Sequence, residues 1–263
     1  MSATPRDYPP GGGGFRTGPV GTAPAVDASC VVSAAVRPCG GPETAVYGAG
    51  RFPAASVVKV GVLAALLLRA QDEGQRPGPA ERAYAEAMIR RSDNDAASAL
   101  WAAIGGPAGL DAAHARLGLT ETSADRAWGR TRTTARDQVA LLRAVFDDGD
   151  ADADGPGVLD AHSRAYLTAL MGQVVPGQDW GVSAAGRGAA LKNGWMTRDA
   201  TGLWAVHSVG RVRAPDGRAL LIAVLSEGHA TKEAGIAVVE RTSVEVAGGR
   251  RPAGAPQGHR AGQ

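Results

Sequence analysis

The stretch Ser56-Val-Val-Lys-Val-Gly-Val-Leu-Ala-Ala-Leu-Leu-Leu-Arg-Ala-Gln71 decides how the rest of the chain must be arranged. As a helix it would be apolar on all sides, which is typical of a helix buried at the centre of a protein. It is too short, and is interrupted too early by Lys59, to cross a membrane. The sequence therefore predicts a core helix whose opening turn carries Ser56 and Lys59, three residues apart and pointing the same way.

The segments around this helix predict the rest of the architecture. Two short β-type runs precede it, at 30–36 and 44–47, with a turn-rich connection that indicates a hairpin. Five helical segments follow, at 81–91, 95–104, 109–117, 134–146 and 158–174. The pattern then changes to strands at 191–196, 203–212 and 220–225 and ends in a helix at 231–246. This order predicts an α/β fold of the α+β type: a five-stranded antiparallel sheet flanked by helices, with an inserted all-helical lobe.

The chain is expected to form one domain between two tails. Residues 26–247 would make up the domain, with the site where its two lobes meet. The expected lobes are an α/β lobe of 26–55 plus 178–247 and a helical lobe of 56–177. Residues 1–25 are rich in Gly and Pro and lack the apolar core of a secretory signal, so a disordered tail is expected there, and a flexible tail at 248–263. The compartment is left open at this point: as it stands, the sequence would give a cytoplasmic protein.

Composition and charge exclude several classes of partner. The 263 residues are 44% apolar and 21% charged, which is enough apolar material for a core that folds alone. The 28 basic residues nearly balance the 26 acidic ones and are scattered along the chain, unlike the basic patches that bind nucleic acid or anionic membranes. We expect a monomer, with neither nucleic acid nor membrane as partner.

The sequence shows no metal or cofactor motif. The five histidines have no paired spacing, and His207 is expected to be a packed core residue. The acidic run 150–155 imitates the start of an EF-hand loop, but Ala161 stands where the bidentate glutamate is needed. Cys30 and Cys39 flank the first predicted strand. A hairpin could pair them, although two reduced thiols are the simpler interpretation. No cofactor and no metal are therefore expected.

Two further motifs supply partners for Ser56 and Lys59. Ser92-Asp-Asn94 falls in a tight link between two predicted helices, and Lys192-Asn-Gly194 falls at the start of a predicted strand. A serine hydroxyl is a weak nucleophile until a neighbour takes its proton, and a desolvated lysine beside a second cation can do so. Lys192 would provide the second positive charge, and the hydroxyl of Ser92 could pass the proton to a leaving nitrogen.

These three motifs, in this order, resemble the S-x-x-K, S-D-N and K-x-G signature of class A β-lactamases and penicillin-binding serine hydrolases. The flanking residues 51–53 and 104–110 are also similar to that superfamily, and the resemblance extends over about 28–247. It implies a β-lactamase/transpeptidase-like fold, a small-molecule or peptidoglycan-like substrate and an exported protein, the last in contrast to the missing signal. It also implies that Ser56 attacks a carbonyl, that Lys59 is the acylation base, and that the backbone N–H groups of Ser56 and Trp195 hold the oxyanion. The implied catalytic residues are Ser56, Lys59, Ser92 and Lys192, and the implied substrate-binding residues are Asn94, Asn193, Gly194 and Trp195.

Two departures from that signature bear on turnover. The segment 118–133 lacks the superfamily's glutamate that activates the deacylating water, and only Glu121 or Asp125 could replace it. Asn193 stands where the superfamily has a Thr or Ser hydroxyl for the β-lactam carboxylate, and an amide could donate the same hydrogen bond from a longer arm. The arginines 126, 130 and 132 could also bind a carboxylate, unless they are simply solvated.

The leading hypothesis is a serine hydrolase that forms an acyl-enzyme at Ser56 with a β-lactam, peptide or ester and deacylates slowly. The alternative is a penicillin-binding or sensor-type module that is acylated or liganded without efficient turnover. A structural protein that merely retains the fold is less consistent with the sequence, because four polar groups at a lobe interface would then be unneeded.

Overall fold

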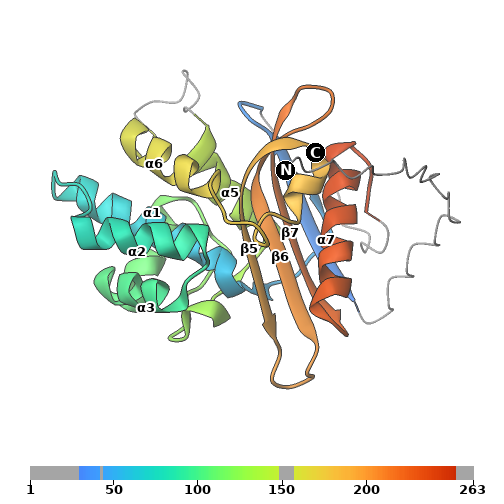
Figure 1. Ribbon diagram of the computed structural model, residues 1–263, viewed down its shortest axis with the longest axis horizontal. Helices are drawn as coiled ribbons and strands as arrows, with labels where there is room; N and C mark the ends of the chain where they lie inside the picture. Colours follow the sequence, from blue (N-terminus) through green and yellow to red (C-terminus); the bar gives the residue numbers. More distant parts are fainter. Residues whose placement is uncertain (1–29, 42–43, 148–156, 253–263) are drawn as a thin grey trace, which may run out of the picture.

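A computed structural model describes residues 30–41, 44–147 and 157–252. It contains a five-stranded antiparallel sheet in the order β2-β1-β7-β6-β5 (Figure 1). The strands are β1 Val31–Pro38, β2 Ala45–Tyr47, β5 Arg187–Thr197, β6 Trp204–Arg213 and β7 Ala219–His229. The predicted fold class is confirmed, and the two sequence-distant ends of the chain meet where β1 pairs with β7.

Helices cover both faces of this sheet (Figure 1). The C-terminal helix α7 lies on one face, and the inserted helical lobe lies on the other side, next to β5. The helices are α1 Val58–Asp72, α2 Pro79–Arg90, α3 Asn94–Ala103, α4 Gly106–Arg116, α5 Ala135–Phe146, α6 Ala161–Met171 and α7 Lys232–Ala247.

Side-chain alternation along β7 divides the core into two parts. Leu221, Ala223 and Leu225 pack towards the helical lobe, together with the apolar side chains of α1. The intervening Leu220 and Ile222 pack into a second cluster beneath α7. Both sets are buried because successive strand residues point to opposite faces and helices cover each face.

The central helix α1 is buried as predicted, but it begins two residues later than the sequence suggested. Ser56 lies in a short 3₁₀ turn, η1, over Ala55–Val57, and α1 starts at Val58. The residues leading into that turn form the two-residue strand β3, Phe52–Pro53, which pairs with β4, Arg132–Thr133. This small sheet was not predicted, because each strand is too short to carry a periodic pattern.

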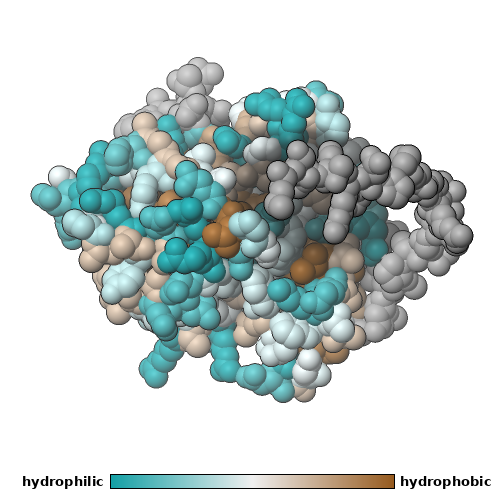
Figure 2. Space-filling view, viewed as in Figure 1, coloured by the Kyte–Doolittle hydropathy of each residue, from teal (hydrophilic) through white to brown (hydrophobic). Residues whose placement is uncertain are grey.

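The surface shown in Figure 2 is mostly hydrophilic, with apolar side chains in isolated spots. The exposed large apolar residues of the described part lie far apart in the sequence: Val31, Tyr84, Val158 and Val244. No helix among the described residues is long and apolar enough to cross a membrane. Cys30 and Cys39 are not joined by a disulfide. The acidic run 150–155 and the tail 1–25 lie outside the described residues.

Candidate active site

Ser56 is presented by a strained turn at the junction of the two lobes. Ala55, the residue before it, has a φ of +46°, in the left-handed region that residues with a Cβ rarely adopt. Such conformations cost about 1–3 kcal/mol and persist only where the surrounding structure enforces them. Here the backbone N–H of Ala54 donates to the carbonyl of Thr131 at 2.7 Å, which fixes the entry to the turn. Ser56 itself remains half-buried.

Strand β5 approaches this turn at Gly194, where only a residue without a side chain fits. A Cβ at Gly194 would lie 2.8 Å from the backbone nitrogen of Ser56 and 2.9 Å from that of Val57. Because of this close approach, the strand residue that follows, Trp195, lies near the backbone N–H of Ser56. Two backbone donors at such a position could stabilise a developing oxyanion.

The Ser92-Asp-Asn94 motif forms the predicted tight link between α2 and α3. Like Ala55, Ser92 has a left-handed backbone although it is not a glycine, at a φ of +59°. Asp93 caps α3, because its carboxylate accepts a hydrogen bond from the N–H of Ala96 at 2.7 Å. With Asp93 used as the cap, the side chains of Ser92 and Asn94 both reach Lys59.

Lys59 is fully buried, and its amine lies among oxygen atoms of the link. Its Nζ donates to Ser92 O at 2.7 Å, to Ser92 Oγ at 3.3 Å and to Asn94 Oδ1 at 2.8 Å. Burial lowers the pKa of Lys59 to about 8, and the charge of Asp93 partly opposes that shift. Among the described residues no hydrogen bond joins this amine to the Ser56 hydroxyl, so to serve as a base for Ser56 the Lys59 amine would have to turn away from the link.

Lys192 on β5 reaches the same hydroxyl from the other lobe. Its Nζ donates to Ser92 Oγ at 3.0 Å and to the carbonyl of Asn193 at 2.9 Å. Burial and the neighbouring charge of Lys59 both lower the pKa of Lys192 well below its usual value. Because Ser92 Oγ accepts from two lysines, its two lone pairs are in use and its own hydrogen is left for a third partner.

Asn193 and the Trp195 side chain do not face this cluster, so the structure does not bring them together with the other predicted site residues. Strand alternation turns both away from Lys192, towards the α7 side of the sheet. The Nδ2 of Asn193 donates to the carbonyls of Gln178 at 3.0 Å and Trp180 at 2.9 Å. The Trp195 ring packs 5.9 Å from that of Trp180, and the Nζ of Lys232 lies 4.0 Å from its centre. Only the backbone N–H of Trp195 remains a candidate at the site.

His207 is the core histidine that the sequence suggested. It is fully buried on β6, donates through Nε2 to the carbonyl of Pro53 at 2.8 Å and accepts at Nδ1 from the N–H of Ser226. Burial lowers its pKa to about 4, so the ring is neutral at physiological pH. Because Pro53 lies three residues before Ser56, the hydrogen bond from His207 helps to hold the segment that leads to Ser56 in place.

Neither predicted acid of the segment 118–133 reaches Lys59 or Ser56. Glu121 is exposed and accepts from Thr134 Oγ1 at 3.3 Å, and Asp125 accepts from the N–H of Ala127 at 2.9 Å. The side chain over the lysine is Trp128, whose ring centre lies 4.9 Å from Lys59 Nζ. Sequence reasoning missed this residue, although it is the only aromatic residue in the segment.

Two of the three arginines of this segment, Arg130 and Arg132, make contacts away from the buried lysines. Arg130 forms an exposed ion pair with Asp199 at 2.7 Å, which joins the segment to the turn after β5. Arg132 donates to the carbonyl of Arg51. Neither contact involves Ser56, Ser92 or either buried lysine.

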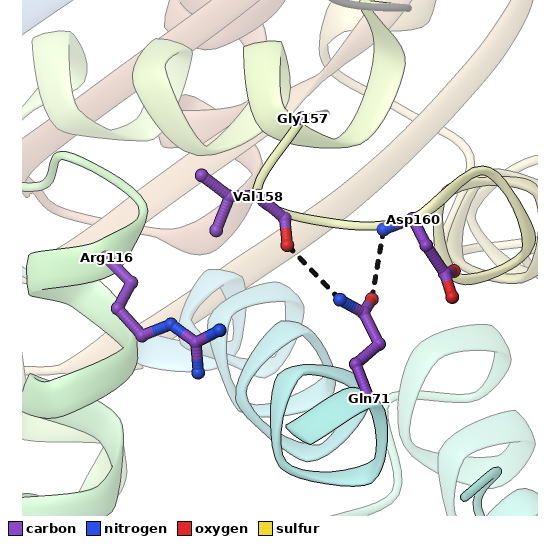
Figure 3. Close-up of a pocket in the computed structure, with 5 residues that line it drawn as sticks. All are labelled: Gln71, Arg116, Gly157, Val158 and Asp160. Atoms are coloured by element: carbon purple, nitrogen blue, oxygen red, sulfur yellow. Dashed lines mark hydrogen bonds between the residues drawn. The ribbon is translucent and has the colours of Figure 1, made fainter. Parts of the chain in front are cut away.

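A separate pocket of about 500 Å³ lies at the other end of α1 (Figure 3). It is lined by Gln71, Arg116, Gly157, Val158 and Asp160. The twelve residues from Lys59 to Gln71 place it about 18 Å along the helix from the buried lysines. The Gln71 amide donates to Val158 O at 3.2 Å and accepts from Asp160 N at 3.0 Å, so it holds the adjacent loop in place.

The sheet, the inserted helical lobe and the junction of the lobes, where serine and lysine side chains meet, define a β-lactamase/transpeptidase-like protein. The sequence model of the Beta-lactamase enzyme family matches residues 81–247, so the chain belongs to that family. The matched part contains Ser92 and Lys192 and begins after Ser56 and Lys59.

Solved structures show the same fold. A putative class A β-lactamase, PenP, from Rhodopseudomonas palustris is 23% identical with a TM-score of 0.67, and the alignment covers 84% of this chain and 94% of that one. A β-lactamase from Chitinophaga pinensis is 20% identical with a TM-score of 0.66, and the alignment covers 81% of this chain and 91% of that one. A mutant of PBP-A, solved as an acyl-enzyme complex with penicillin G, is 21% identical with a TM-score of 0.67, and the alignment covers 84% of this chain and 90% of that one.

Proposed function

We propose that the protein is a serine hydrolase that forms an acyl-enzyme at Ser56 with a β-lactam, peptide or ester and releases the acyl group slowly. The observation that carries this proposal is the convergence of two buried lysines, Lys59 and Lys192, on the hydroxyl of Ser92. Burying two amines is unfavourable, and burial lowers the pKa of both. The pKa of Lys59, about 8, suits proton transfer near neutral pH.

Each step of acylation has a candidate group. Neutral Lys59 takes the proton of Ser56, whose Oγ then bonds to the carbonyl carbon of the substrate. The backbone N–H groups of Ser56 and Trp195 hold the oxyanion as the carbonyl bond opens. When the intermediate collapses, the bond to the leaving nitrogen or oxygen breaks, and Ser92 gives that atom its proton. Lys59 can then restore the proton to Ser92, because the two already lie 3.3 Å apart.

The chain offers few means of removing the acyl group. Among the described residues no carboxylate makes a hydrogen bond or ion pair with Ser56 or Lys59, and Asp93 is used as a helix cap. We therefore expect the water that hydrolyses the acyl group to be activated poorly. This observation also favours the second candidate function, a penicillin-binding or sensor-type module that is acylated once without efficient turnover.

The proposal can be tested by mixing the protein with penicillin G, a chromogenic cephalosporin and an activated ester, and following both product and intact mass. Penicillin G is a suitable first donor because PBP-A, a structural relative, was solved as its acyl-enzyme. We expect a single stoichiometric mass increase that decays slowly and that Ser56→Ala abolishes. Rapid continuous turnover would overturn slow release, and an unchanged mass with every donor would overturn the proposal.

The rate of acylation is expected to rise with pH. Only neutral Lys59 can accept the proton of Ser56, and its pKa is about 8, so the neutral fraction rises about tenfold per pH unit below pH 7 and levels off above pH 8. Stopped-flow acylation between pH 5.5 and 9.5, corrected for spontaneous donor hydrolysis, measures this profile. A rate that stays flat or falls as pH rises would show that Lys59 is not the base.

A further inference from the structure

Trp128 is held in a fixed position beside the turn that carries Ser56. It begins the 3₁₀ turn η2, Trp128–Arg130, which packs against η1. A Cβ at Gly129 would lie only 3.9 Å from the Cα of Ala55, and the carbonyl of Thr131 accepts from the N–H of Ala54. These backbone contacts with the turn that carries Ser56 therefore fix the position of the Trp128 backbone, from which the indole extends.

The orientation of the indole is fixed by a second contact. Its Nε1–H donates to Ser98 Oγ on α3 at 3.3 Å, so the ring spans from η2 to the helical lobe. Lys59 Nζ lies 4.9 Å from the ring centre, in the range of a cation–π interaction. The three oxygens of Ser92 and Asn94 that accept from this amine lie in the α2–α3 link, and the ring contacts the amine from a separate segment.

We propose that Trp128 is a specificity-determining residue that protects the acyl group on Ser56 from water by covering the Lys59 amine. The inference rests on the proposed function and deepens it. Hydrolysis requires a water oxygen to bond to the acyl carbonyl carbon while a base takes its proton, after which the bond to Ser56 Oγ breaks and the serine regains a hydrogen. Since no carboxylate of the described residues bonds to Ser56 or Lys59, we take Lys59 as the base for that water.

An indole face at this place opposes hydrolysis in two ways. It is apolar, so it offers no hydrogen-bond partner to a water beside the amine. It also favours the charged form of Lys59, which cannot take a proton. The second effect slows every proton transfer to Lys59, including the one that starts acylation at Ser56 on η1. The exclusion of water from the amine is therefore what makes Trp128 act against hydrolysis in particular.

The test measures how fast the acyl group leaves. Wild type, Trp128→Ala and Trp128→Phe are acylated with penicillin G, freed of excess donor, and followed by intact mass. We expect the loss of the added mass to be about 10-fold faster in Trp128→Ala and within about 3-fold of wild type in Trp128→Phe, which keeps an aromatic face over the amine. Ser98→Ala, which removes only the indole hydrogen bond, should lie between them.

Thermal unfolding shows whether each variant is folded. If Trp128→Ala does not fold, Trp128→Gln fills much of the same space with a polar group that can hold a water, and it should also release the acyl group faster than wild type. Release at the wild-type rate from a folded, acylated Trp128→Ala or Trp128→Gln would overturn the role of Trp128 and leave the proposed function intact. A wild-type protein that no donor acylates would overturn both.

Discussion

Replacing Lys59 with methionine is expected to slow acylation of Ser56 by about 10²- to 10⁴-fold, the range that a positioned general base contributes. Methionine has a similar length and apolar character, so it can fill the buried space that the lysine occupies. It cannot accept a proton, and Ser56 would have to react as a neutral alcohol. Intact-mass kinetics with penicillin G measure the rate at pH 8, where about half of the wild-type lysine is neutral.

The chain contains a matched control for this substitution. Lys232, on α7, also lies over an indole, with Nζ 4.0 Å from the centre of the Trp195 ring, but it is on the other face of the sheet. Lys232→Met removes a lysine and a cation–π contact without touching the cleft, so acylation should proceed at the wild-type rate. Equal losses in Lys232→Met and Lys59→Met, or no loss in a folded Lys59→Met, would exclude Lys59 as the base.

The sequence predicts those parts of the fold in which a long run of residues has an unambiguous hydrophobic pattern. The all-round apolar run from Val57 to Leu68 could only be a buried helix, and three long β-type runs after Trp180 could only complete a sheet with the N-terminal hairpin. The start of α1 was misplaced because the turn at Ala55 and Ser56 depends on a left-handed residue that tertiary contacts impose.

The orientation of Asn193 and Trp195 could have been predicted from the sequence. If the side chain of Lys192 faces the helical lobe, the alternation of side chains along a strand places those of Asn193 and Trp195 on the opposite face, as in the structure. Trp128 is different, since its contact with Lys59 joins segments almost seventy residues apart and no local pattern indicates it. The contact between Trp128 and Lys59 depends on the packing of η2 against η1.

Adding one methyl group at Gly194 is expected to slow acylation by about 10²- to 10³-fold, the effect of losing an oxyanion donor. The Cβ of Gly194→Ala would lie 2.8 Å from the nitrogen of Ser56 and 2.9 Å from that of Val57. Both are backbone atoms and cannot swing aside, so β5 and the nucleophile turn must separate. Gly194 lies in a strand, and its φ is not in the left-handed region, so the effect comes from lost space and not from backbone strain.

Gly129→Ala provides the comparison, because its new methyl would meet the Cα of Ala55 at 3.9 Å, an ordinary van der Waals contact beside the same turn. It should acylate within a few-fold of wild type.

Separation of β5 from η1 moves the N–H of Trp195 away from that of Ser56, and Lys59 and Ser92 belong to the other lobe. The pH profile of Gly194→Ala should therefore keep its midpoint near pH 8 while the plateau falls. A shifted midpoint with an unchanged plateau would mean that Gly194 acts on Lys59 and not on the oxyanion.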